Sequence, residues 1–402
     1  MTQASAAFGE EGTRRYTLQE VLASALAQGL AVAAWKLPLQ PEVQLCISFQ
    51  PHFSQEFPAL EPSPSGFLFC PFQTSSGNPN IFIKADLTIS SVTGQLTVAP
   101  DAPAEAVQLF YQALQEGVHP IPAWHMPLPL PQPEARTEET FKAAVSLAVD
   151  LMTAEAMEKV VLSRTNTVTL PQSFDLVTAF RKMQTAYPNA FISLVSVPGI
   201  GTWMGASPEI LVSIDPQQVF KTVALAGTQP ASEDGSTANA IWRQKEIEEQ
   251  GMVERYVLSC FKKLRLREYS EIGPRTVIAG NLMHLRTDFK VDLKEVDYPT
   301  LGSDMLQLLH PTSAVCGLPK EPALAFLLAN EGYDRSYYSG YLGPVNSTAG
   351  THQFVNLRCM QLLPDKAVLY AGAGITAESS PEKEWLETQH KMQTMLKILS
   401  EF

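Results

Sequence analysis

Residues 137–164 read TEETFKAAVSLAVDLMTAEAMEKVVLSR and contain the two patterns that decide the fold. Thr137 is a suitable helix N-cap, and the two glutamates that follow it favour the positive end of a helix. Apolar residues then recur with helical period at Phe141, Val145, Ala148 and Met152. The stretch ends in a run rich in β-branched residues, 159–164, which indicates a buried strand. A helix followed by a buried strand predicts a mixed α/β protein.

Further elements of both kinds follow along the chain. Strands are predicted at Phe191–Val197, Glu209–Ile214 and Val219–Val223. A long helix is predicted from about Ala238 to Leu264. A last helix begins at Ser380, with Pro381 at its first position, and continues to the end of the chain.

The first third of the chain has a different composition. It is rich in Pro, Ser and Gln, and the run 120–133 contains so many prolines that it cannot form a helix or a central strand. We expect an extended connector there. The sequence therefore divides into an N-terminal region, 1–135, which is part of the same fold, and a region 136–402 that carries the candidate chemistry.

Charge and cysteine usage exclude several classes of protein. The net charge is −12, and the sequence contains no Lys/Arg-rich run, so nucleic acid is not an expected partner. The five cysteines are scattered without a CxxC pair, which fits a reducing cytoplasm. No apolar stretch is long enough to cross a bilayer, and the N-terminus lacks the pattern of a secretory signal. We expect a cytoplasmic protein whose partner is a small molecule.

Both late helices carry two glutamates three residues apart, Glu246 with Glu249 and Glu384 with Glu387. This spacing places each pair on one face of its helix. If the two faces meet, the four carboxylates need a cation, and an oxygen-only ligand set suits Mg²⁺. The spacing alone favours the alternative of a solvated helix face, in which Glu387 and Lys391 form an ordinary ion pair.

Three charged residues occur at the ends or in the middle of predicted strands. Lys159 is either a strand-end lysine that reaches solvent or a desolvated lysine that acts as a base. Glu209 is either a turn residue or a carboxylic acid that stays protonated. Arg358 interrupts the apolar segment 354–362, so its partner is either a structural acid or a carboxylate of a substrate.

Two other features carry weaker signals. The glycines of 371–375 would let backbone amides approach an anion, although the dinucleotide-binding pattern is absent. His310 precedes Pro311, and the residues alone favour an ordinary loop histidine.

Taken together, these segments resemble the chorismate-utilising enzymes, which include isochorismate, salicylate, anthranilate and aminodeoxychorismate synthases. Nine stretches match in order over about the last two thirds of the chain. They are 159–164 (KVVLSR), 205–209 (GASPE), 225–228 (LAGT), 245–250 (KEIEEQ), 309–317 (LHPTSAVCG), 338–340 (YSG), 357–359 (LRC), 371–375 (AGAGI) and 380–388 (SPEKEWLET).

The resemblance implies a layered α/β/α fold with two large, mostly antiparallel sheets, like that of anthranilate synthase component I. It implies that Glu249 and Glu387 bind Mg²⁺ directly, while Glu246 and Glu384 hold metal-bound waters. It further implies that Lys159 is the base that activates water and that Glu209 is the acid. Residues expected to contact the substrate are Gly227, Thr228, His310, Tyr338, Arg358, Ala373 and Gly374.

A few positions separate the members of this family. Lys159 matches the lysine of the isochorismate and salicylate synthases, and Ala226 stands where aminodeoxychorismate synthases place a nucleophilic lysine. No Leu-Leu-Glu-Ser motif and no fused glutamine amidotransferase are present. Three positions depart from the family pattern, Gln250, Ser313 and Ser336, which weakens inferences about fine substrate preference.

The resemblance therefore implies an isochorismate synthase, an isomerase that serves menaquinone or siderophore biosynthesis. We expect water to attack C2 of chorismate while the C4 hydroxyl leaves. The alternatives are a salicylate synthase, which would go on to eliminate pyruvate, and an inactive chorismate-binding homologue. We expect a monomer without an amidotransferase subunit and without membrane association.

Overall fold

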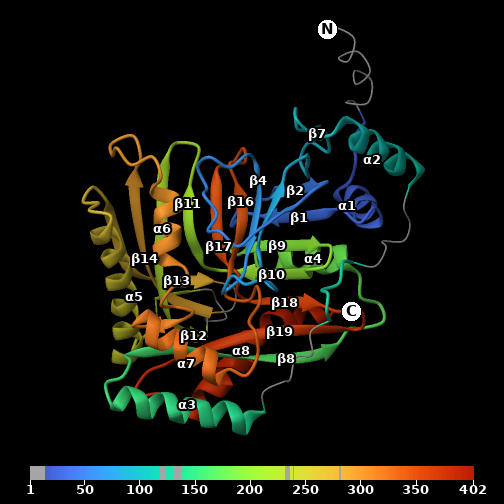
Figure 1. Ribbon diagram of the computed structural model, residues 1–402. Coiled ribbons are helices and arrows are strands. Elements are labelled where there is room, and N and C mark those ends of the chain that lie inside the picture. The colour runs from blue at the N-terminus through green and yellow to red at the C-terminus, as the bar shows by residue number, and fades with distance from the viewer. Residues whose placement is uncertain (1–13, 118–123, 131–136, 231–235, 239, 280–281) are drawn as a thin grey trace.

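The computed structural model describes residues 14–402 apart from 118–123, 131–136, 231–235, 239 and 280–281, and without the side chains of residues 228, 230, 279 and 282. In the described part of the chain, two large sheets contain all the named strands, and every pair of neighbouring strands is antiparallel. The expected fold class, with two large antiparallel sheets and flanking helices, is confirmed (Figure 1).

The first sheet has ten strands. In spatial order they are β15 (Gly317–Leu318), β8 (Lys159–Thr169), β19 (Lys366–Ile375), β18 (Cys359–Leu362), β10 (Gly201–Ser207), β9 (Phe191–Val197), β1 (Ala31–Lys36), β2 (Val43–Ser48), β6 (Leu87–Ser90) and β7 (Leu96–Val98).

The second sheet has nine strands. In spatial order they are β13 (Ser270–Ala279), β14 (Leu282–Asp292), β12 (Val219–Pro230), β11 (Ile210–Ile214), β17 (Thr351–Val355), β16 (Tyr341–Val345), β4 (Gly66–Cys70), β5 (Asn80–Lys84) and β3 (His52–Ser54). The N-terminal region thus supplies strands to both sheets.

Helices flank these sheets. Those in the described residues are α1 (Leu18–Ala27), α2 (Ala104–Glu116), α3 (Glu138–Thr153), α4 (Leu176–Ala186), α5 (Gln244–Lys263), α6 (Leu301–Leu309), α7 (Lys320–Asn330) and α8 (Pro381–Leu399). Figure 1 shows α3 and α8 beside β8 and β19, and α5 beside β12 and β14. None of these helices is both long enough and apolar enough to span a membrane.

The local signals place most of these elements correctly. Thr137 caps α3, and its side chain accepts a hydrogen bond from the backbone of Thr140. The last helix begins at Pro381, as predicted. The long helix α5 begins at Gln244 rather than near Ala238, and residues 231–235 and 239, just before it, lie outside the described residues. Of the predicted connector, residues 124–130 are described, and there Pro127 forms an isolated bridge with Gly199 and Ile200.

Strand β1 shows how the ten-stranded sheet is buried on both faces. Val32 and Ala34 pack in a cluster with the helices α1, α2, α4 and α8, whereas Ala31, Ala33 and Trp35 pack in a second cluster toward the nine-stranded sheet. Successive side chains of a strand point to opposite faces. A strand whose side chains are apolar on both faces is therefore typical of a sheet that lies between a layer of helices and a second sheet.

The chain passes directly from one sheet to the other at two places that matter for the site. Residues 207–209, which we call the glutamate crossover, connect β10 to β11, and residues 356–358, the arginine crossover, connect β17 to β18. The two crossovers lie side by side, because Ala206 donates a backbone hydrogen bond to Arg358 and Val355 donates one to Glu209. They bring Glu209 and Arg358 to the same region of the molecule.

Candidate active site

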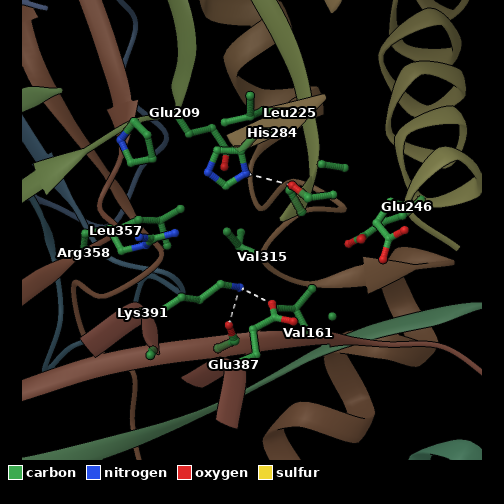
Figure 2. A pocket seen from close by; sticks show the side chains of 18 of the residues that line it. Val161, Glu209, Leu225, Glu246, His284, Val315, Leu357, Arg358, Glu387 and Lys391 are labelled. Carbon is green, nitrogen blue, oxygen red and sulfur yellow. Dashed lines mark hydrogen bonds and ion pairs between the residues drawn. The ribbon is translucent and has the colours of Figure 1, made fainter. Parts of the chain in front are cut away.

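A pocket opens beside the two crossovers, and most of its walls come from segments that the sequence analysis singled out (Figure 2). Its lining includes Val161 of β8, Leu225–Gly227 of β12, His284 of β14, Ala314 and Val315, and Tyr370–Gly372 and Gly374 of β19. Besides His284 and Tyr370, the polar and charged side chains that line it are Glu209, Lys245, Glu246, Glu249, Tyr338, Arg358, Glu387 and Lys391.

Glu209 stands on the glutamate crossover with only 7% of its surface exposed. Burial raises its pKa to about 7, although the positive charges of Lys159, Lys391 and Arg358 act in the opposite direction. A carboxyl group with this pKa is partly protonated at neutral pH, so Glu209 can donate a proton to an atom in the pocket.

Lys159 is 1% exposed, and its Nζ lies 2.7 Å from Oε1 of Glu249. The neighbouring strand permits this contact through Gly374, where a Cβ would lie 2.9 Å from the same Glu249 oxygen and 3.3 Å from Cε of Lys159. Lys159 is not itself part of the pocket lining, but it contacts the lining carboxylate of Glu249. The alternative of a solvent-exposed strand-end lysine does not hold.

Arg358 has a φ of 49°, a left-handed conformation that a non-glycine residue rarely adopts. Its Nη1 contacts Oγ1 of Thr394 at 3.4 Å, and it takes part in no ion pair among the described residues. Burial lowers its pKa, while Tyr338 and Glu387 act to raise it. The guanidinium group therefore has donors to offer to an anion in the pocket.

Three of the four predicted carboxylates line the pocket, Glu246, Glu249 and Glu387. Glu384 is 2% exposed and is not part of the lining; its Oε1 lies 3.0 Å from Nζ of Lys245. Burial and the nearby Glu387 raise the pKa of Glu384, even though Lys245 acts against the shift. The two glutamate pairs thus face one region from α5 and α8, and like charges repel there.

Lysines balance this negative charge. Lys159 contacts Glu249 and Lys391 contacts Glu387, both at 2.7 Å. Burial acts to lower the pKa of Lys245, but the carboxylates of Glu384, Glu387 and Glu249 outweigh burial and raise it.

Within the described residues, no three His, Cys, Asp or Glu side chains are close enough together to form a metal site in this arrangement. The donor set still fits Mg²⁺ in chemistry, because it consists of carboxylate oxygens in an electrostatically crowded pocket.

The remaining predicted residues fall into three groups. Gly227, Tyr338 and Gly374 line the pocket, and Ala373 lies in β19 between two lining glycines without being part of the lining itself. The side chain of Thr228 lies outside the described residues. The structure does not bring His310 into the pocket lining: its Nε2 lies 3.1 Å from the carbonyl oxygen of Phe72, and its ring packs edge-on against Tyr341.

The sequence analysis did not single out three of the polar side chains that line the pocket: His284, Lys245 and Tyr370. Nδ1 of His284 lies 2.8 Å from the carbonyl oxygen of Gly227 and therefore donates to it. Burial, aided by Arg358, lowers the pKa of His284 to about 3, so the ring is neutral. A single histidine in β14 carries no sequence pattern that marks a pocket, so the sequence offered no signal for it. Lys391 was considered only as a partner of Glu387, yet its Nζ also donates to the backbone of Gly372 in the pocket wall (Figure 2).

Comparisons with known proteins identify the family of this chain. A family model described as "Chorismate binding enzyme" matches residues 3–400. The vibriobactin-specific isochorismate synthase of Vibrio cholerae is 30% identical over 265 residues, which cover 64% of this chain and 66% of that protein. This chain therefore aligns with just under two thirds of that relative.

Two solved structures share the fold. The menaquinone-specific isochorismate synthase MenF from Escherichia coli superposes with a TM-score of 0.77 at 20% identity, covering 96% of this chain and 91% of MenF. Anthranilate synthase component I from Streptococcus pneumoniae superposes with a TM-score of 0.62 at 23% identity, covering 86% of this chain and 83% of that protein.

Proposed function

This chain belongs to the chorismate-binding enzymes, and on that premise we propose that it is an isochorismate synthase, an isomerase that converts chorismate into isochorismate. The observation that carries the proposal is the set of charged groups in and directly beside one pocket. A buried carboxyl group with a pKa of about 7, Glu209, lies within electrostatic range of a buried lysine, Lys159, and of Arg358. An acid, a base and an anion-binding group are what the exchange of hydroxyl groups on an anionic ring requires.

In the proposed reaction, water attacks C2 of the ring, both ring double bonds shift by one position, and the C4 hydroxyl leaves as water. Lys159 takes a proton from the attacking water, and Glu209 gives a proton to the leaving oxygen, so one water enters and one departs. Because Nζ of Lys159 donates to Glu249 in the structure, the base role requires this contact to be released first.

Arg358 is the proposed anchor for a carboxylate of chorismate, because a guanidinium group can hold a carboxylate through two parallel hydrogen bonds. We propose that Tyr338 and the backbone of Gly227, Ala373 and Gly374 complete the substrate contacts, together with Thr228. His310, which the resemblance implied, is the weakest member of this set, because its Nε2 is already engaged by Phe72.

We propose Mg²⁺ as the cofactor, held directly by Glu249 and Glu387, with Glu246 and Glu384 binding its water ligands. When bound, the ion would offset the carboxylate charge and attract the ring carboxylate of chorismate. The residues of this chain fit that role: Glu246, Glu249 and Glu387 line the pocket from α5 and α8, and Glu249 and Glu387 would exchange their lysine contacts for the ion.

The wider setting is part of the proposal as well. Menaquinone and siderophore biosynthesis are the two candidate pathways. The chain is similar to the menaquinone-specific MenF and to the vibriobactin-specific synthase, whose names point to these two pathways. We propose a cytoplasmic monomer that acts on a small molecule without a glutamine amidotransferase subunit. The genes beside the coding sequence would decide between the two pathways.

The direct test is incubation of the purified protein with chorismate and Mg²⁺, followed by chromatography of the products. We expect isochorismate to accumulate and Lys159→Ala to abolish turnover. Equimolar pyruvate, measured with lactate dehydrogenase, together with fluorescent salicylate would favour the salicylate synthase instead. Binding of chorismate without any turnover would favour an inactive homologue.

A further inference from the structure

The two crossovers are joined by a side chain as well as by the backbone. Ser207, the first residue of the glutamate crossover, is 3% exposed. Its Oγ donates a hydrogen bond to the carbonyl oxygen of Val355 at 2.5 Å and accepts one from the backbone N–H of Glu209 at 3.3 Å. A single hydroxyl group therefore connects the backbone of Glu209 to the end of β17, just before the arginine crossover.

Asn356 makes the corresponding link on the other side. It is 2% exposed, and its Nδ2 donates to the carbonyl oxygen of Tyr337 at 2.9 Å. Its backbone exchanges two hydrogen bonds with the same turn, accepting from Ser339 at 2.9 Å and donating to Gly340 at 2.8 Å. Tyr338, in the middle of this turn, lines the pocket.

This arrangement matters because residues 208–209 and 356–358 lie between the named strands and have no register partner in either sheet. Arg358 adopts a φ of 49° and Ser339 a φ of 59°, and such conformations persist only when surrounding contacts enforce them. The side chains of Ser207 and Asn356 supply contacts close to these two residues, to the carbonyl oxygens of Val355 and Tyr337, from positions that do not line the pocket.

We propose that Ser207 and Asn356 are positioning residues that act through the two crossovers. Ser207 sets the placement of Glu209, and Asn356 sets the placement of Arg358 and Tyr338. The assignment of chemical roles to Glu209 and Arg358 rests on the proposed function. The linkage itself rests on the hydrogen bonds and burial described above. A displacement of about 1 Å in a reacting group can lower a rate by about a hundredfold, so small shifts of these crossovers have large effects.

The test for Ser207 is the Ser207→Ala variant, with Ser48→Ala as the matched control. Ser48 is also fully buried in a strand of the ten-stranded sheet, and its Oγ makes one side-chain hydrogen bond, to Asp86. We expect kcat of Ser207→Ala to fall about tenfold or more, with KM changed much less, while Ser48→Ala retains the parental kcat. Ser207→Thr keeps the hydroxyl group and should recover most of the lost kcat.

Equal kcat values for Ser207→Ala and Ser48→Ala, in proteins of matched melting temperature, would overturn the role of Ser207. If Ser207→Ala does not fold, Ser207→Cys serves in its place, because it keeps the size of the side chain but donates only weakly. Its kcat is expected to fall in the same direction, and an unchanged kcat counts against the proposal.

Asn356 is tested by binding, which requires no turnover. Calorimetric titration with chorismate should give a Kd about fivefold or more weaker for Asn356→Ala than for the parent, and the difference should be clearly smaller in an Arg358→Ala background. An unchanged Kd, or an equal loss in both backgrounds, contradicts the positioning role. If the parent binds chorismate without converting it, the proposed function fails while this titration still decides whether Asn356 acts through Arg358.

Discussion

At the scale of single residues, the protonation state of Glu209 determines how the site can work. Burial keeps its pKa near 7, whereas a solvent-exposed glutamate would be ionised at every physiological pH. The three cations that act against burial, Lys159, Lys391 and Arg358, keep this pKa from rising further. Glu209 is therefore placed to act as an acid at neutral pH.

A pH profile checks this role. Because the general acid must be protonated, kcat/KM should fall as the pH rises through about 7, and should approach a tenfold loss per pH unit above it. Glu209→Gln should be inactive, since an amide cannot give up a proton to the leaving oxygen. A kcat/KM that stays level between pH 6 and about 9, or an active Glu209→Gln variant, would remove Glu209 from the acid role.

Arg358→Lys tests the substrate anchor. Lysine retains the charge but cannot offer the planar pair of donors that matches a carboxylate, so kcat/KM should fall about tenfold to a hundredfold. Arg275→Lys is the control, because the side chain of Arg275 is 55% exposed and pairs with Asp288 away from the pocket lining. A kcat/KM within twofold of the parent for Arg358→Lys would place the substrate carboxylate elsewhere.

Glu249→Gln tests the proposed metal ligand. A neutral amide is a weaker ligand for a hard cation, so the Mg²⁺ concentration that gives half-maximal activity should rise about tenfold or more. Glu248→Gln provides the control, since Glu248 is the exposed neighbour on the same helix. The same Mg²⁺ dependence in both variants would contradict direct ligation by Glu249.

At the scale of secondary-structure elements, the outer edge of β8 is completed by side chains. The short strand β15 pairs only with Lys159 and Val160. Beyond it, Nη2 of Arg335 donates to the carbonyl oxygen of Val161 at 2.6 Å, and Glu331 accepts from the backbone of Ser163 at 2.7 Å. The buried Arg335–Glu331 ion pair thus continues the hydrogen bonding of the strand that carries Lys159.

Arg335→Met should destabilise the protein by about 3–5 kcal/mol, because it leaves the buried Glu331 carboxylate without its partner. Lys142→Met, which breaks an i, i+4 pair of partly exposed side chains with Glu138, should cost at most about 1 kcal/mol. Urea denaturation measures both effects. Similar losses in the two variants would show that the edge of β8 does not depend on the Arg335 pair.

The elements differ in how far the sequence could predict them. The helix after Thr137, the strand from Lys159 and the helix from Pro381 carry local signals, namely caps, proline at the first helical position and β-branched residues, and they were predicted. The ion pair at the edge of β8 could not be predicted, because Arg335 and Val161 meet only through tertiary folding.

The same reason explains where the sequence analysis and the pocket lining differ. Glu249 and Glu387 were identified because their spacing and the family resemblance agreed. His284 was missed because a single histidine in an apolar strand carries no local sign of the cavity that it faces. His310 was included through the resemblance, and the structure instead surrounds it with Phe72 and Tyr341.

At the scale of the whole molecule, the pocket depends on two sheets that exchange strands. Residues 31–98 contribute strands to both sheets, so the N-terminal region is built into the layers that support the pocket. The glutamate and arginine crossovers pass between these layers, and α5 and α8 bring their carboxylates to the same place. Site residues from distant parts of the sequence therefore meet because of the topology of the two sheets.

The most direct test of the central claim is a single incubation of the purified protein with chorismate and Mg²⁺ in water enriched in oxygen-18, followed by mass spectrometry. The account predicts that chorismate is converted into isochorismate carrying one oxygen-18 atom, in the hydroxyl group at C2, with no release of pyruvate. Unlabelled isochorismate would contradict attack by water. Salicylate with equimolar pyruvate, or unchanged chorismate, would contradict the assignment as an isochorismate synthase.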